Sequence, residues 1–338
     1  MLMKQAGCAI KLSFHYSRRY GLAIGLVFAL FYLNGCISEA PRKNPLDPAL
    51  GIKLSGVVEK SADGNAIQQA LIRVLPGETT AVSNENGEFR FDEVFNNGSY
   101  SVICTKDAFA PDTLELNLNA SQNLSFALNE LPLISDVSVT TRYEARFLPP
   151  NRTFLEFGVS GRDSDRPGSL VSAVVEVPGF SFLDSLIEVE PLNDQRFFNR
   201  FVASDFGINT LEALIGKPAF FWIQDAEGAK SAVIQGQLAR IITQLPRPLE
   251  PSGLIGMPFD FHWEQRTLPF DFTYAIEIYL NVGINLPPVD TIEDIPSNQT
   301  LLSYNNPALN QQNYFWVLYI VDEFGNRSRS YETTLQIQ

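Results

Sequence analysis

The chain has 338 residues, a formal net charge of −13, and a composition that is 45% hydrophobic and 19% charged. This composition excludes a disordered chain, and the length predicts two or three domains. The acidic balance, without a basic cluster beyond residue 50, excludes a nucleic-acid binder, because such proteins concentrate Lys and Arg against phosphates. Three Cys and two His are too few for a zinc site or a disulfide framework.

Residues 1–35 have the layout of a secretory signal peptide. Four basic residues and no acid precede a short apolar run at residues 21–33, which is too short to span a membrane comfortably. The run leads into Leu33-Asn34-Gly35-Cys36, which resembles the lipobox of bacterial lipoproteins, although Asn34 departs from the commonest residue at its position. An ordinary signal peptide with an incidental cysteine is the alternative.

The lipobox resemblance implies cleavage before Cys36 and lipidation of that cysteine. Two or more acyl chains anchor stably, because each buried methylene contributes about 0.8 kcal/mol. Ile37 in place of Asp implies sorting to the outer membrane in a host with two membranes. The periplasmic face and the outer face of that membrane are both compatible with the sequence. The mature chain would carry 21 basic and 38 acidic residues, and residues 36–50, with three prolines, would form an extended tether.

From residue 51 onward, short runs with apolar residues at every second position are separated by Gly, Pro, Asn and Asp clusters. This pattern predicts an all-β protein, with three β-sandwich modules in series at residues 51–130, 131–243 and 244–338. One helix is predicted at residues 204–215, with Asp205 or Asn209 as its cap.

The first module, residues 51–130, resembles the carboxypeptidase regulatory-like (transthyretin-like) domain. The resemblance covers about 80 residues and implies a β-sandwich without catalysis. Its matching positions are Gly56, Val58, Ala70, Ile72, Gly87, Phe89, Phe91, Gly98, Tyr100 and Val102.

The other two modules resemble domains of cell-surface proteins. Residues 157–177 in the second are similar to bacterial Ig-like lipoprotein domains, and Trp263 with the later alternating strands makes the third similar to a fibronectin type III domain. Both modules contain an Asp-x-x-Gly segment after a strand, at residues 225–228 and 322–325, and we expect a hairpin turn capped by the Asp at each place.

Three groups of polar residues are candidate sites. Asp260, His262 and Glu264 point to one face of a strand and could bind a metal or act as acid and base, but Phe261 and Trp263 need the core, so this face is expected to be solvated. The acids at 188, 190 and 194 are also interpreted as surface residues. Asp163 and Asp165 could bind Ca²⁺, although a polar hairpin loop is the simpler interpretation.

Aromatic and thiol side chains are further candidates for a role in binding or chemistry. We expect the three tryptophans, Trp222, Trp263 and Trp316, to pack in cores, and the loop residues Phe180, Phe182 and Tyr304 to be better placed to stack on a ligand. Cys104 is expected to be a buried, inert thiol.

Three Asp-Ser/Thr-aliphatic triplets match a short O-glycosylation pattern of some bacteria. Their acceptor residues are Thr113, Ser185 and Thr291.

These observations predict a lipid-anchored, non-catalytic binding or scaffolding protein of the cell envelope, with a membrane contact through Cys36 and a protein or glycan partner. No metal and no cofactor are expected. The alternative is a glycan-binding accessory lipoprotein of an outer-membrane uptake system. A third hypothesis is a metal-dependent hydrolase that uses His262.

Overall fold

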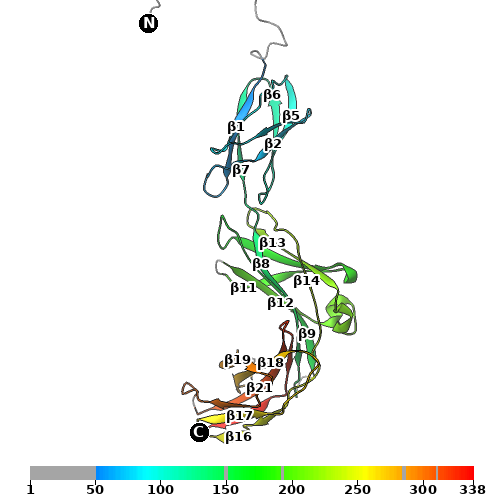
Figure 1. Cartoon of the computed structure of the whole chain (residues 1–338), viewed down its shortest axis with the longest axis vertical. Coiled ribbons are helices and arrows are strands. Elements are labelled where there is room, and N and C mark those ends of the chain that lie inside the picture. Colours follow the sequence, from blue (N-terminus) through cyan, green and yellow to red (C-terminus); the bar gives the residue numbers. More distant parts are fainter. Residues whose placement is uncertain (1–50, 148–150, 192–193, 284–286, 310) are drawn as a thin grey trace, which may run out of the picture.

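A computed structural model describes residues 51–147, 151–191, 194–283, 287–309 and 311–338. These residues form three β-sandwiches that follow one another along the longest axis of the molecule (Figure 1). The all-β prediction is therefore confirmed. The signal peptide, the tether and Cys36 lie outside the described residues, and within these no helix is long and apolar enough to cross a membrane.

The first sandwich consists of two sheets, with strand orders β4-β1-β7 and β3-β2-β5-β6. Strands with every second side chain inward enclose its core, as in β7, where Leu124, Phe126 and Leu128 are buried between exposed neighbours. Its strands are β1 (Leu54–Lys60), β2 (Leu71–Leu75), β3 (Thr79–Val82), β4 (Glu88–Arg90), β5 (Gly98–Thr105), β6 (Asp112–Leu118) and β7 (Gln122–Leu128).

The second sandwich is one sheet that curls around its own core, with strand order β14-β13-β10-β11-β12-β9-β8. Phe157, Val175 and Phe221 are buried at its centre. Its strands are β8 (Leu133–Glu144), β9 (Arg152–Arg162), β10 (Leu170–Val177), β11 (Phe182–Glu190), β12 (Gln195–Phe201), β13 (Pro218–Asp225) and β14 (Ile234–Gln237).

The predicted helix at residues 204–215 is wrong. Two short 3₁₀ turns occupy this region, η2 (Ala203–Phe206) and η3 (Leu211–Leu214), and a third, η1 (Pro178–Phe180), precedes β11. Gly207, with a φ of 66°, ends η2, and the extended Thr210 separates η2 from η3. The apolar residues whose spacing predicted one helix lie instead in these two turns, and Phe206, Leu211 and Leu214 are buried in the core.

In the third sandwich, the sheet β15-β17-β20 faces the sheet that contains β18 and β21. Trp263 and Trp316 are buried between the two sheets. Its strands are β15 (Pro248–Glu250), β16 (Gly253–Ile255), β17 (Phe259–Trp263), β18 (Phe272–Leu280), β19 (Asp290–Pro296), β20 (Leu301–Tyr304), β21 (Asn313–Asp322), β22 (Arg327–Arg329) and β23 (Thr333–Ile337).

A parallel pairing between β8 and β22 joins the second and third sandwiches into one thirteen-stranded sheet. Arg142, Tyr143 and Glu144 at the end of β8 pair with residues 327–329 of β22. The twelve-residue β8 is long enough to contribute to both sandwiches, because its first part pairs only with β9 and its last three residues also pair with β22. The end of β8 therefore extends the sheet of the third sandwich beside β22, and from there Arg142 reaches the ring of Tyr319 on the outer face of β21.

Candidate functional site

A cleft of about 600 Å³ lies where the second sandwich meets the third. The end of β8 and Arg200 of β12 form one side, while β18 and β21 form the other. Its lining combines charged side chains of both signs with an aromatic pair, and this mixture suits a polar ligand that also presents a flat surface.

The floor of the cleft is the outer face of β18 and β21, and the alternation of these strands explains why aromatic residues lie there. Trp316 and Leu318 point into the core, so Phe315, Val317 and Tyr319 point to the opposite face. Tyr279 of β18 stacks on Phe315 with ring centroids 4.9 Å apart and an angle of 7° between the planes. The stacked pair is half-buried and borders the cleft.

Glu277 is the centre of a hydrogen-bonded network beneath this aromatic pair, and it is only 6% exposed. Its carboxylate accepts a hydrogen bond of 2.7 Å from the hydroxyl of Tyr319 and a short one from the hydroxyl of Tyr279. The Nη2 atom of Arg142 lies 3.2 Å from the same carboxylate, and that guanidinium also lies over the ring of Tyr319. Each of these four side chains thus has at least one partner within the network.

The end of β8 supplies the charged wall of the cleft. Arg142 forms a second ion pair with Glu144 at 3.2 Å, and Arg146 reaches the other oxygen of Glu144 at 2.6 Å. Glu144 is 3% exposed. Since a buried carboxylate needs compensating cations, the two arginines hold it in place and in turn are held at the edge of the cleft.

The two tyrosines of the network act as hydrogen-bond donors at neutral pH. Burial, together with the hydrogen bond to Glu277, raises the pKa of Tyr279 to about 12. Burial raises the pKa of Tyr319 well above its usual value too. Neither phenol can therefore serve as a general base near neutral pH, because both remain protonated.

The cleft escaped the sequence analysis because its residues come from strands far apart in the chain, with 135 positions between Arg142 and Glu277. One feature of the sequence does indicate that the outer face of β21 is covered. β21 is apolar at almost every position, and a strand of that kind is covered on both faces, whereas a strand with one solvated face alternates.

Asp260, His262 and Glu264 of the third sandwich lie as predicted. Phe261 and Trp263 are buried, while Asp260 is exposed and His262 and Glu264 are half-buried on the outer face of β17. His262 does not border the cleft. No three His, Cys, Asp or Glu side chains among the described residues are arranged to hold a metal ion together.

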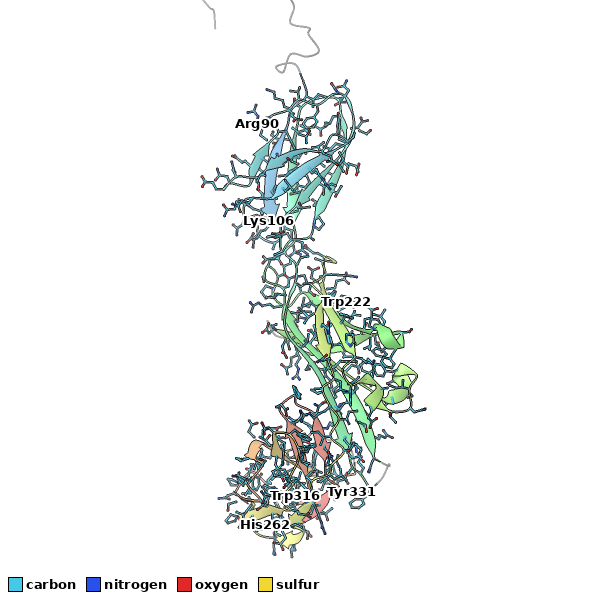
Figure 2. All side chains as sticks on the ribbon, turned by 45° about the vertical axis from the view of Figure 1, so that its right-hand side comes forward. Arg90, Lys106, Trp222, His262, Trp316 and Tyr331 are labelled. Carbon is cyan, nitrogen blue, oxygen red and sulfur yellow. The ribbon has the colours of Figure 1, made fainter. Side chains whose placement is uncertain are left out.

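Two expectations about aromatic residues are wrong. Trp222 is half-buried on the outer face of β13, because Ala219, Phe221 and Ile223 take the inward positions; Figure 2 shows it on the second sandwich, far from Trp316 on the third. Of the loop residues expected to stack on a ligand, Phe182 and Tyr304 are core residues, each 7% exposed.

Phe180 is partly buried against the core of the second sandwich. Phe182 starts β11 at an inward position, and Tyr304 donates a hydrogen bond of 2.6 Å to Asp290. None of the three borders the cleft.

The remaining predicted positions lie outside the cleft. Cys104 is fully buried and unpaired, and burial raises the pKa of its thiol to about 12. Thr113, Ser185 and Thr291 are exposed on strands β6, β11 and β19.

Glu188, Glu190 and Asp194 are exposed, as expected. Glu188 accepts a hydrogen bond from Gln195, and Glu190 lies 3.6 Å from Arg196.

The two predicted Asp-x-x-Gly turns are present and equivalent. One oxygen of Asp225 accepts hydrogen bonds from the backbone of residues 227 and 229, and one oxygen of Asp322 accepts them from residues 324 and 326. Gly228 and Gly325 adopt φ values of 91° and 85°, which favour glycine.

Each of these turns also contacts the preceding part of the chain. The other oxygen of Asp225 accepts a hydrogen bond of 2.7 Å from Asn129 of the first sandwich. The side chain of Asn326 accepts one of 2.8 Å from the backbone of Thr141 in β8. The same turn is thus used at both junctions between sandwiches.

Asp163 and Asp165 lie in a polar loop, as predicted, but it is not a hairpin, because it joins β9 to β10, which do not pair with each other, and it lies at the first of these junctions. Asp163 is 2% exposed, and Asp165 accepts a hydrogen bond from the backbone of Glu130, where the first sandwich ends. Two effects raise the pKa of Asp165 to about 6. Burial is the larger one, and the hydrogen bond with Asp163 is the second.

Comparison with known families identifies the first sandwich. Residues 53–129 match the family described as the carboxypeptidase regulatory-like domain. This part of the chain is such a domain, which confirms the resemblance found in the sequence. No curated protein matches the chain.

Solved structures with detectable similarity are distant. A cohesin–X-dockerin complex from Acetivibrio cellulolyticus is 18% identical over 24% of this chain and 58% of that chain, with a TM-score of 0.21. A putative carbohydrate binding protein from Bacteroides uniformis is 12% identical over 56% of this chain and 99% of the other (TM-score 0.22). Domains FN1–FN3 of chicken CNTN1 are 8% identical over 85% and 99% (TM-score 0.32). With all three TM-scores below 0.5, none of these likenesses assigns a ligand to this chain.

Proposed function

We propose that the chain is a lipid-anchored, non-catalytic protein of the cell envelope, and that the cleft between its second and third sandwiches binds its partner. The observation that carries the binding role is the stacked pair of Tyr279 and Phe315 beside the Glu277–Arg142 network, in a hollow of about 600 Å³. Ligand sites in proteins have volumes in this range and combine apolar walls with a few fixed polar groups.

The chemistry of the lining supports binding rather than catalysis. The described lining residues include no Ser, Cys or His that could act as a nucleophile or as a base near neutral pH. Glu144 and Glu277 are held by arginines, so these charges are fixed before a ligand arrives. Fixed polar groups reduce the entropy lost when a ligand binds.

A glycan is the partner that this arrangement favours. Sugar rings present C–H groups that can lie against Phe315 or Tyr279, and their hydroxyl groups can pair with the arginines and carboxylates of the lining. This chemistry corresponds to the alternative hypothesis of an accessory lipoprotein in an outer-membrane uptake system. A protein partner would use the same cleft through a loop that carries polar and aromatic side chains.

Binding to a glycan array, followed by titration of the best glycan, tests this proposal. The protein for this test begins at residue 37, so that it carries no lipid. Replacement Phe315→Ala should weaken binding at least tenfold, a loss of about 1.4 kcal/mol, because the stacking surface is removed. The control Phe324→Ala removes an aromatic ring that is 51% exposed and does not line the cleft, and it should leave affinity unchanged. If no polysaccharide binds, the glycan part of the proposal is refuted.

The anchor is tested separately in a bacterial host. The sequence Leu33-Asn34-Gly35-Cys36 supports lipid attachment at Cys36. Radiolabelled palmitate should be incorporated into the native chain and lost in Cys36→Ala, and membrane fractionation should place the native chain in the outer membrane. Labelling that survives the substitution would refute the anchor.

A further inference from the structure

A pair of exposed aromatic residues, Phe147 and Tyr331, joins the second sandwich to the third outside the cleft. Phe147 follows the end of β8, and Tyr331 lies between β22 and β23; Figure 2 shows Tyr331 where the long strands of the second sandwich reach the third. The two rings lie against each other with centroids 4.8 Å apart and an angle of 31° between the planes. Neither ring belongs to a hydrophobic core of the described residues.

The exposure of this pair sets it apart from the other aromatic residues. Phe147 is 71% exposed and Tyr331 is 39% exposed. Of the remaining aromatic side chains that the structure describes, only Phe324 is also exposed, and the guanidinium of Arg240 lies over its ring. A single exposed apolar residue needs no explanation, but adjoining ones beside a cleft indicate an interaction surface.

The aromatic pair lies next to lining residues from both sides of the cleft. Arg146, which directly precedes Phe147, lines the cleft, and so do Arg329 and Glu332, which lie on either side of Tyr331 in the chain. The Nη2 atom of Arg146 pairs with a carboxylate oxygen at 2.6 Å, while its Nε is buried without a hydrogen-bond partner among the described residues. A hydrogen-bond donor is therefore available beside the exposed rings.

The chain limits the distance between this pair and the stacked rings of the cleft. Thr334 of β23 pairs with Phe315 of β21, and such cross-strand partners lie about 5 Å apart. Tyr331 precedes Thr334 by three residues, which span at most about 11 Å. The backbone of Tyr331 thus lies within about 16 Å of that of Phe315. Since neither Phe147 nor Tyr331 lines the cleft, a ligand that contacts both aromatic pairs must extend beyond it.

On the basis of the function proposed above, we infer that Phe147 and Tyr331 form a second sugar subsite, and that the ligand is a polysaccharide whose chain continues out of the cleft across these rings. An exposed ring offers a flat apolar surface to the C–H face of a sugar. A polymer of repeating sugars presents the same face to two aromatic pairs in turn, and its hydroxyl groups can accept the free N–H of Arg146 between these contacts.

Titration with a size series of the best-binding glycan tests the inference on the lipid-free protein that begins at residue 37. The series starts at the disaccharide, and the affinity of the native chain should rise with length until both aromatic pairs are covered. Tyr331→Ala should weaken binding of the longest oligosaccharide about tenfold and leave that of the disaccharide unchanged. Tyr331→Phe keeps the ring and should bind both like the native chain. The matched control Phe324→Ala removes an exposed ring that does not line the cleft and should change neither affinity.

Phe315→Ala separates a failure of the second subsite from a failure of the proposed function. If Phe315→Ala weakens binding, but Tyr331→Ala and Phe147→Ala hold the longest oligosaccharide as tightly as the native chain does, the second subsite alone is overturned. Equal weakening of the shortest and longest ligands by Tyr331→Ala would overturn it too, because the ring would then act on the shape of the cleft. If no oligosaccharide binds, the glycan part of the proposed function fails and the second subsite fails with it. Circular dichroism melting of each variant confirms that it is folded.

Discussion

Replacement of Glu277 by Gln tests whether the network beneath the cleft is a stabilising element. The substitution keeps the size of the side chain and removes its charge. It weakens the hydrogen bonds from Tyr319 and Tyr279 and leaves Arg142 with Glu144 as its remaining acidic partner. Removal of one partner from a buried ion pair costs about 3–5 kcal/mol, and the retained pair at 3.2 Å reduces the loss, so we expect about 3 kcal/mol.

The tryptophans make this loss measurable in one sandwich. The chain has three, of which Trp263 and Trp316 lie in the third core and Trp222 in the second sandwich. In a Trp222→Phe background, fluorescence during urea unfolding reports on the third sandwich alone. This choice matters, because a multidomain chain does not unfold in a single two-state step.

The control for this experiment is Glu293→Gln in the same background. Glu293 is exposed and pairs with Arg327 at 3.1 Å, so its loss should change the free energy of unfolding by less than about 1 kcal/mol. The double variant Glu277→Gln with Arg142→Gln should lose less than the sum of the two single losses, since the two groups interact directly. A loss of under about 1 kcal/mol for Glu277→Gln, or strict additivity, would refute the reasoning.

Three further predictions concern other parts of the chain. Asn326→Ala should lower the stability of the third sandwich by about 2 kcal/mol in urea unfolding, because it leaves the backbone N–H of Thr141 buried without an acceptor; an unchanged midpoint would contradict this. The free energy of unfolding should fall as pH rises from about 10 to 12, because Tyr279 loses its proton at a lower pH in the unfolded chain than in the folded one. Tyr279→Phe should reduce that fall, and the midpoints of urea unfolding across this pH range measure it. Cys104 should react with a thiol reagent only after unfolding, and prompt labelling of the native chain would show that it is accessible.

The features that could be predicted from the sequence are those that depend on neighbouring residues. Strand alternation placed Phe261 and Trp263 in the core, and the spacing of Asp322 and Gly325 predicted the turn that the structure contains. The first domain was recognisable because its glycines and aromatic residues occur at fixed intervals within one module.

The features that could not be predicted depend on which face of a strand meets another module. Trp222 lies in an alternating strand, but alternation alone does not say which of its two faces is inward. The β8–β22 pairing joins a strand to a partner of only three residues, too short to show any periodicity. The cleft depends on that pairing, so it could not be predicted from the sequence either.

The β8–β22 pairing determines how the cleft can move relative to the first sandwich. Backbone hydrogen bonds cross from the second sandwich to the third, while the two sheets of the first sandwich remain separate from the thirteen-stranded sheet. The last two sandwiches should therefore move together as one body. Bending of the chain should concentrate near residue 130, at the first junction. The two sides of the cleft therefore belong to parts of the chain that share one hydrogen-bonded sheet.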